Sequence, residues 1–75
     1  MTLREVLAEN LKRHRLATGL SQEELAHRAD IDRTYVSSLE RCQYSATVDM
    51  IEKLARVLSV EAAELLVVPS AARET

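Results

Sequence analysis

The stretch from Gln22 to Leu39 constrains the fold of this 75-residue chain more than any other part of the sequence. Its apolar and small residues lie on both sides of a tight corner at Asp30. They are Leu25, Ala26, Ala29, Ile31, Val36 and Leu39. Two short helices that cross steeply need this arrangement, because only a small side chain such as Ala26 fits where their backbones approach most closely. The stretch therefore predicts a packed pair of helices, with the outer face of the second helix left free.

Capping residues and apolar periodicity predict where the helices begin and end. Ser21 and Glu24 form the capping-box pattern that opens a helix. Asp32 and Thr47 are N-cap candidates for the third and fourth helices. Gly19 can adopt the left-handed conformation that ends the first helix. Five helices are predicted, at about residues 3–18, 22–30, 33–41, 48–58 and 61–67.

Length and composition indicate one all-α domain. A chain of 75 residues has apolar surface for a single core only. Its apolar fraction of 47%, with one Gly, one Pro and neither Trp nor Phe, favours helices joined by tight corners. We expect the domain to cover residues 1–68, and Pro69 to end the final helix before a frayed polar tail over residues 69–75.

The charge balance does not by itself point to nucleic acid. The net charge of −2 lacks the basic surplus on which nonspecific DNA binding usually rests. Residues 1–41 carry seven basic and seven acidic side chains, whereas the remaining residues carry three and five. The acidic excess therefore lies in the C-terminal part. A locally positive face requires arginines of the first part to gather on one side, and the candidates are Arg13, Arg28, Arg33 and Arg41.

The outer face of the predicted third helix carries hydrogen-bonding side chains of medium length. These are Arg33, Thr34, Tyr35, Ser37 and Ser38. Such a helix fits the major groove of DNA, where arginine pairs with guanine O6 and N7 and threonine or tyrosine contacts a thymine methyl group. Gln22, at the start of the preceding helix, is placed to hold a phosphate together with the backbone amides of that helix end. The pattern favours a double-stranded DNA operator as the partner.

Two runs of sequence carry a family resemblance, and they are SQEELAHRADIDRTYVSSLER and TVDMIEKLARVLSVEAAELL. Together they resemble the Cro and phage-repressor (XRE-type) helix-turn-helix family over about residues 6–67. The run DRTYVSSLER is most similar to the recognition helix of restriction-modification controller proteins, which are small homodimers that regulate their own operon and the endonuclease gene. The resemblance implies a five-helix lambda-repressor-like fold and a transcriptional regulator encoded by a bacterium or a phage.

The resemblance also implies roles for individual residues. Base reading is implied for Arg33, Thr34 and Tyr35. Contact with the DNA backbone is implied for Gln22, Ser37, Tyr44 and Ser45. A buried ion pair is implied between Arg15 and Glu40.

Three positions depart from the family pattern. Gly or Asn usually stands at the corner occupied by Asp30, Gly usually follows the third helix where Cys42 stands, and Pro is common at the position of Ala46. Asp30 would add negative charge beside the DNA, so the resemblance does not fix the docking angle of the reading helix.

A regulator with one reading helix needs a partner subunit, because a monomer offers too few base contacts for useful specificity. Leu65, Leu66 and Val68 offer more apolar surface than a short terminal helix needs for its own core, so we expect a two-fold interface there. A homodimer would bind a near-palindromic operator with its two reading helices roughly 34 Å apart. Two alternatives stay open, namely an antitoxin or other protein-interaction module with the same fold, and a phage-type repressor.

Several other functions are disfavoured by the sequence. It has no Gly-rich phosphate loop, nucleophile elbow or paired acid and base, so we expect no enzyme activity. His14, His27 and Cys42 lack metal-ligand spacing, and we expect no metal, cofactor or small-molecule ligand. A lone cysteine forms no internal disulfide, and no apolar run approaches the roughly 20 residues that span a bilayer. We therefore expect a cytoplasmic protein without a membrane partner, in which Cys42 is a small residue at a helix end rather than a redox switch.

Overall fold

Four α-helices and a short 3-10 helix make up residues 1–69, which are the residues that the computed structural model describes. They are α1 (Leu3–Ala17), α2 (Gln22–Ala29), α3 (Arg33–Glu40), α4 (Val48–Leu58) and the 3-10 helix η1 (Ala62–Leu66). These residues include no strand. The predicted all-α fold is confirmed to this extent, and the short final helix predicted at about residues 61–67 is a 3-10 helix rather than a fifth α-helix. Of the expected tail over residues 69–75, the part from residue 70 onward lies outside the described residues.

The last helical segment is a 3-10 helix, a form that proteins use in short pieces. It has five residues between the extended residues Glu61 and Val67, and Glu61 provides no side-chain cap. Its backbone instead forms the tighter i to i+3 bond, from the Glu64 amide to the Glu61 carbonyl at 2.9 Å. Asn10 of α1 reaches two further carbonyls of this segment, with its Nδ2 donating to Leu65 at 3.0 Å and to Val67 at 2.7 Å.

Side-chain caps open the α-helices where the sequence predicts them. The hydroxyl of Ser21 begins α2, the carboxylate of Asp32 begins α3 and the hydroxyl of Thr47 begins α4. Each accepts a hydrogen bond from a backbone amide of the first turn, at 3.0, 2.7 and 3.1 Å respectively. These caps account for three of the predicted helix starts.

The capping box predicted at Ser21 is only half formed. The Glu24 amide donates to the Ser21 hydroxyl, but the Glu24 carboxylate accepts from Arg28 at 2.8 Å instead of reaching back. A complete capping box opens α1, where the Thr2 amide donates to Glu5 at 2.7 Å and the Glu5 amide donates to Thr2 at 3.2 Å. Glu24 does not reach back because it pairs with Arg28, which lies one turn further along the helix.

All four α-helices end in the same way. A left-handed residue follows the helix, and the amide of the next residue donates to the carbonyl five positions earlier, which is the Schellman closure. The left-handed residues are Gly19, Asp30, Cys42 and Ser59, with φ of 76°, 58°, 61° and 58°. The donating amides belong to Leu20, Ile31, Gln43 and Val60, at 2.8 to 3.1 Å. This closure reverses the chain sharply and makes short connections between helices.

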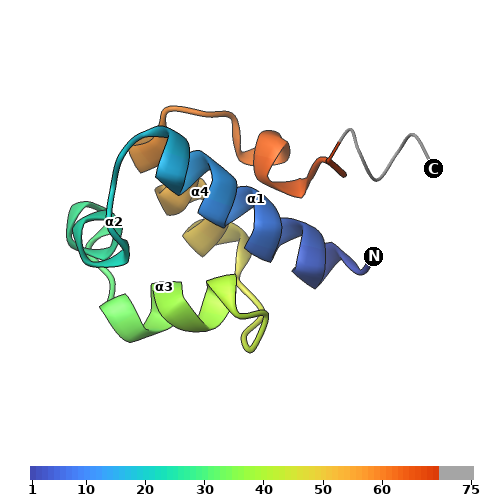
Figure 1. The fold of residues 1–75 in the computed structure, drawn as a ribbon, viewed down its shortest axis with the longest axis horizontal. Coiled ribbons are helices and arrows are strands. Elements are labelled where there is room, and N and C mark those ends of the chain that lie inside the picture. Colours follow the sequence, from blue (N-terminus) through green and yellow to red (C-terminus); the bar gives the residue numbers. More distant parts are fainter. Residues whose placement is uncertain (70–75) are drawn as a thin grey trace.

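The helices surround one core and leave one side of α3 uncovered. Figure 1 shows α2 and α3 joined at a corner, and the last described segment running beside α1. α4 packs against α2 and η1. Ala26 is buried in the α2 and α3 pair, as its small size predicts. The core consists of Leu7, Leu11, Leu25, Ala26, Ala29, Val36, Leu39, Ile51, Leu54, Ala55, Leu58 and Leu65.

Candidate nucleic-acid interface

The free face of α3 begins with two exposed side chains, Arg33 and Thr34. Asp32 is the N-cap of α3, and its Oδ1 accepts a hydrogen bond from the Thr34 amide at 2.7 Å. That hydrogen bond lowers the pKa of the Asp32 carboxyl below its ordinary value of 3.8. Val36 and Leu39 face the core, so the opposite face of α3, which begins with Arg33 and Thr34, is exposed to solvent.

Four of the side chains on and after α3 border one shallow hollow, and they are Arg33, Thr34, Ser37 and Arg41. Ser37 is half-buried there. Ser38, expected on the same outer face, is 8% exposed and belongs to the buried side of the helix. Ser38 lies three positions after Tyr35, which packs against the core, so these two residues share a covered side of the helix. The surface available for a ligand is therefore narrower than the sequence predicts.

Arg33 also borders the N-terminal end of α2. A second hollow is lined by Arg15, Ser21, Gln22, Glu23 and Arg33. The first-turn amides of a helix attract anions, because they lack partners within the helix and lie at the positive end of its dipole. A ligand that contacts Arg33 can therefore reach the start of α2 as well as the face of α3.

A buried ion pair stabilises the region where α2 meets α3. Arg15 of α1 donates to both carboxylate oxygens of Glu40, from Nε at 2.6 Å and from Nη2 at 3.0 Å. The two side chains are 9% and 4% exposed. The hydrogen bonds to Glu40 hold the pKa of the Arg15 guanidinium above its ordinary value. Gln22 joins the pair, since its Nε2 donates to Glu40 Oε1 at 3.1 Å. One carboxylate thus connects α1, α2 and α3.

The loop after α3 carries the other two predicted backbone contacts, Tyr44 and Ser45, and both are exposed. Tyr44 stacks on Tyr35 of α3, with ring centroids 5.4 Å apart and planes 10° from parallel. Tyr35 is half-buried and packs against the core on its way to the surface. No local pattern in the sequence relates a residue on a helix to one on the following loop, so this pairing of the two tyrosines was not predicted.

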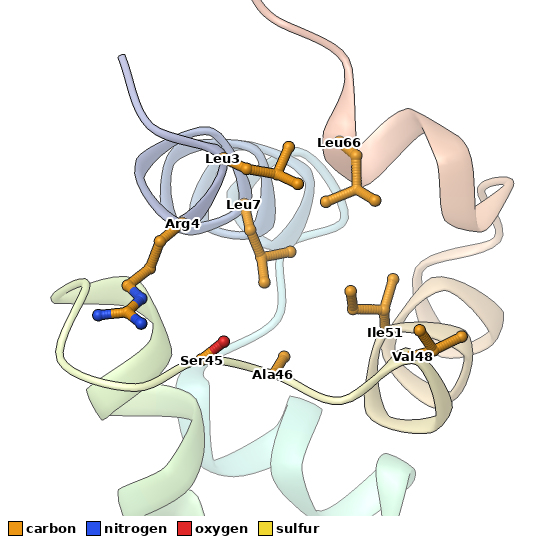
Figure 2. A pocket seen from close by; sticks show the side chains of 8 residues that line it. All are labelled: Leu3, Arg4, Leu7, Ser45, Ala46, Val48, Ile51 and Leu66. Atoms are coloured by element: carbon orange, nitrogen blue, oxygen red, sulfur yellow. The ribbon is translucent and has the colours of Figure 1, made fainter.

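An apolar hollow lies between the first turns of α1, the loop after α3, the start of α4 and η1 (Figure 2). It has a volume of about 260 Å³ and is lined by Leu3, Arg4, Leu7, Ser45, Ala46, Val48, Ile51 and Leu66. The Arg4 side chain points away from it, toward the end of α3 (Figure 2). Val48 at its rim is 82% exposed. The hollow is an apolar surface that water covers in the single chain.

Of the three residues expected at a dimer interface, only two are accessible. Leu66 is half-buried and lines the apolar hollow, and Val68 is half-buried. Leu65 is fully buried in the core of the chain itself, so its expected place at an interface is wrong. The physical reason is that η1 packs on α1 and α4, and one of its two leucines must face them.

The four arginines that were candidates for one positive face do not all lie together. Arg33 and Arg41 border the same hollow. Arg28 forms an ion pair with Glu24 and borders a different hollow, whose basic side chains also include Lys53 and Arg56. Arg13 donates to Asn10 at 2.9 Å, beside η1. Neither Arg33 nor Arg41 has an ion-pair partner among residues 1–69. Of the four candidates, Arg33 and Arg41 therefore supply positive charge at α3.

Asn10 is a structural residue that the sequence analysis did not single out. It is fully buried, and its Oδ1 accepts from Arg13 while its Nδ2 donates to η1. Its position on the apolar stripe of α1, four residues after Val6 and three after Leu7, is the signal that could have identified it. A buried amide on a stripe of this kind indicates a specific partner.

Within residues 1–69, no group of three or more His, Cys, Asp or Glu side chains is arranged to hold a metal ion. No helix in the same part of the chain is long and apolar enough to cross a membrane.

Sequence comparison places the chain among regulators. The sequence profile of the family HTH_3, described as helix-turn-helix, matches residues 11–65. A hypothetical transcription factor of Neisseria meningitidis serogroup B is 48% identical over 67 residues, which are 89% of this chain and 63% of that protein. This chain therefore spans less than two thirds of that relative. The control protein C.SmaI of Serratia marcescens is 38% identical over 66 residues, covering 88% of this chain and 79% of that protein.

Structural comparison gives the same assignment. The crystal structure of the hypothetical transcription factor NHTF from Neisseria superposes with a TM-score of 0.90 at 44% identity, over 97% of this chain and 84% of that chain. The restriction-modification controller protein C.AhdI from Aeromonas hydrophila gives 0.80 at 40% identity, over 83% and 94%. The controller protein C.Esp1396I, solved as a tetramer with its natural 35 base-pair operator, gives 0.79 at 31% identity, over 87% and 86%.

Proposed function

Because the chain belongs to the XRE-type helix-turn-helix family HTH_3, in which its relatives include restriction-modification controller proteins, we propose that it is a sequence-specific DNA-binding transcriptional regulator. It acts as a homodimer on a near-palindromic operator. The observation that carries this proposal is the placement of Arg33, which borders both the free face of α3 and the N-terminal end of α2. A DNA duplex bound there would contact both Arg33, which reads a base, and the N-terminal end of α2, which binds a phosphate.

The reading step uses the first turn of α3 in the major groove. Arg33 donates to guanine O6 and N7, and Thr34 and Tyr35 contact neighbouring base edges or a thymine methyl group. Both Arg33 and Thr34 are exposed, so neither has to leave a packed position to do this. Arg41, at the other end of the same helix, adds positive charge for the DNA backbone.

The holding step uses groups that contact phosphates. Gln22 offers its side-chain amide and the amides of the α2 N-terminus, and Ser37, Tyr44 and Ser45 offer hydroxyl groups from α3 and its following loop. Gln22 is already oriented by its hydrogen bond to Glu40. Because phosphates carry no sequence information, these groups set the position of α3 on the duplex while α3 itself reads the bases.

Dimerisation through the apolar hollow is the second part of the proposal. Leu3, Val48 and Leu66 surround it, and Val68 lies just beyond η1. A second copy covering this surface would remove it from water and double the number of base contacts. Two subunits related by a two-fold axis would place their α3 helices in successive major grooves, roughly 34 Å apart.

Control of a restriction-modification operon is the finer role that we propose. The similarity to the control protein C.SmaI and to the restriction-modification controller protein C.AhdI supports this role. The alternative is an antitoxin or other protein-interaction module. In that case the apolar hollow would bind a different protein instead of a second copy of this chain.

Selection of bound duplexes from a random pool tests the proposal directly. The wild-type chain should enrich a symmetric site with half-sites about 10 base pairs apart, which is one turn of B-DNA. The same selection with Arg33→Ala should enrich a less defined site. Enrichment of no sequence by a folded, dimeric wild-type chain would contradict the proposed function and favour the interaction module.

A further inference from the structure

The two tyrosines of this chain form one stacked unit that joins α3 to the loop after it. Their ring centroids lie 5.4 Å apart and their planes are within 10° of parallel. Offset stacking at this separation is one of the arrangements that aromatic pairs prefer. Tyr35 lies in the first turn of α3, next to Arg33 and Thr34, whereas Tyr44 lies in the loop beyond the end of the helix. The contact therefore brings the loop back to the reading end of α3.

The loop is fixed before Tyr44 is reached, so the stack does not depend on a freely moving segment. The Gln43 amide donates to the Ser38 carbonyl at 2.8 Å, and the Cys42 amide donates to the Leu39 carbonyl at 3.1 Å. Cys42 adopts the left-handed conformation that this closure requires. Tyr44 therefore leaves an anchored backbone and lies over Tyr35.

Tyr35 contacts both the core and Tyr44. It is half-buried and packs against the core residues, while Tyr44 is 56% exposed and covers part of the ring of Tyr35. A tyrosine on a helix surface without such a cover would sample several rotamers. Two contacts on one ring restrict it to few, which lowers the entropy that has to be lost when the ring meets a base pair.

We propose that Tyr44 is a positioning residue for base reading, which holds the ring of Tyr35 in the orientation that contacts the operator. The proposal rests on the proposed function and refines it, because it gives the Tyr44 ring a part in sequence discrimination beyond any contact of its hydroxyl group with phosphate. Tyr35 touches the base pair, and Tyr44 acts on discrimination through Tyr35.

Binding measurements on three duplexes test the positioning role. The probes are the duplex enriched from a random pool by the wild-type chain, the same duplex with single base pairs substituted, and a scrambled duplex. Tyr44→Leu should lower the affinity ratio between the enriched and the substituted duplex by about three- to tenfold at one position in each half-site. Tyr44→Phe, which keeps the ring and removes the hydroxyl group, should retain the ratio. Gln43→Ala is the matched control in the same loop and should also retain it.

A double-mutant comparison separates positioning from direct contact. In the Tyr35→Ala background, a further Tyr44→Leu change should leave the affinity ratio where it is, because Tyr44 then has no ring to hold. If Tyr44→Leu instead weakens all three duplexes by the same factor, Tyr44 is a backbone contact only and the positioning role is overturned. Failure of the proposed function looks different, because the wild-type chain would then enrich no duplex at all, and the positioning role would be rejected with it.

The composition allows a second measurement that needs no DNA. The chain contains two Tyr and neither Trp nor Phe, so biosynthetic labelling with fluorotyrosine gives one fluorine NMR signal for each ring. The Tyr35 signal should shift in Tyr44→Leu and should stay in place in Gln43→Ala, with thermal unfolding confirming that both variants fold. A Tyr35 signal that is the same in wild type and in Tyr44→Leu would show that the rings do not stack in solution, and would overturn the proposal.

Discussion

Arg15 and Glu40 form a bidentate ion pair that fastens the first helix to the last turn of α3, with N to O distances of 2.6 and 3.0 Å. Arg15 also donates from Nη1 to the Leu20 carbonyl at 2.9 Å, and Gln22 donates to Glu40. Neighbours therefore add hydrogen bonds to both charged groups, which is a condition under which a buried charge pair is tolerated. Its effect is to fix the direction of α3 relative to the rest of the fold.

Loss of one partner of this pair should destabilise the chain strongly. Glu40→Ala leaves the Arg15 charge buried without a counter-charge, so the free energy of unfolding should fall by about 3–5 kcal/mol. Glu24→Ala is the matched control, because its pair with Arg28 is exposed and should contribute only about 0.2–1 kcal/mol. Urea unfolding of both variants measures the difference. Equal losses in the two variants would show that the Arg15 pair is hydrated in solution.

Asn10 should prove necessary for the docking of η1. Its Nδ2 has two hydrogens, so its two shortest contacts, to Leu65 at 3.0 Å and Val67 at 2.7 Å, are the ones it can satisfy fully. Asn10→Ala leaves these carbonyls without their donor and should cost about 1–3 kcal/mol of unfolding free energy. Lys12→Ala, exposed on the same helix, is the control and should unfold like the wild type. An Asn10→Ala chain as stable as that control would contradict the assignment.

Arg33 and Gln22 should have different effects on DNA binding. Arg33→Ala should remove about 1–3 kcal/mol of discrimination at one base-pair position per half-site, with the fold unchanged, because the side chain is exposed. Gln22→Ala should weaken the enriched and the scrambled duplex by similar factors. Arg56→Ala on α4 is the control for removing a positive charge. The measurement is a set of binding curves at one fixed salt concentration. An unchanged affinity ratio in Arg33→Ala would mean that this arginine does not read bases.

The cap of α3 should make stability depend on pH in the acid range. The hydrogen bond from the Thr34 amide lowers the pKa of Asp32 below its ordinary value of 3.8. The folded state therefore favours the charged form, so this stabilisation is present above pH 3.8 and is lost as the pH falls through the folded pKa. Asp32→Asn keeps an acceptor oxygen without the charge. The difference in unfolding free energy between wild type and this variant should shrink on acidification, and a difference independent of pH would argue against the charged cap.

The apolar hollow should control the oligomeric state. Val48→Asp adds a charge at its rim, where the side chain is 82% exposed in the single chain, so it should break the dimer and leave the fold intact. Leu16→Asp is the matched control, since Leu16 is 59% exposed at the other end of α1. Sedimentation velocity distinguishes the two. A Val48→Asp chain that remains dimeric, or a wild-type chain that is monomeric, would place the interface elsewhere or remove it.

Local patterns in the sequence were sufficient for most of the helices. Ser21, Asp32 and Thr47 mark helix starts because a cap acts within three residues, and Ala26 marks a close crossing because size alone decides what fits there. The stripe of apolar residues on α4 likewise follows from one helical period. Interactions between residues within one helical turn can therefore be predicted from the sequence before the fold is known.

Longer-range contacts explain what the sequence analysis did not predict. η1 depends on Asn10, which lies 55 residues from Leu65, and the same packing buries Leu65 that was expected at an interface. Within the candidate site, the Tyr35 and Tyr44 stack depends on how the loop after α3 returns, and no period relates the two positions. Each of these contacts is decided by the path of the chain through space.

The four closures at the helix ends affect the unfolded chain as well as the folded one. Three of the four left-handed residues, Asp30, Cys42 and Ser59, carry a side chain, and only Gly19 does not. A side chain in this conformation costs roughly 1–2 kcal/mol in the folded state. A glycine in its place would relieve that strain, but it would also give the denatured ensemble more backbone freedom to lose on folding. With a single glycine in 75 residues, this protein starts from a comparatively narrow denatured ensemble, and part of its stability is set before any native contact forms.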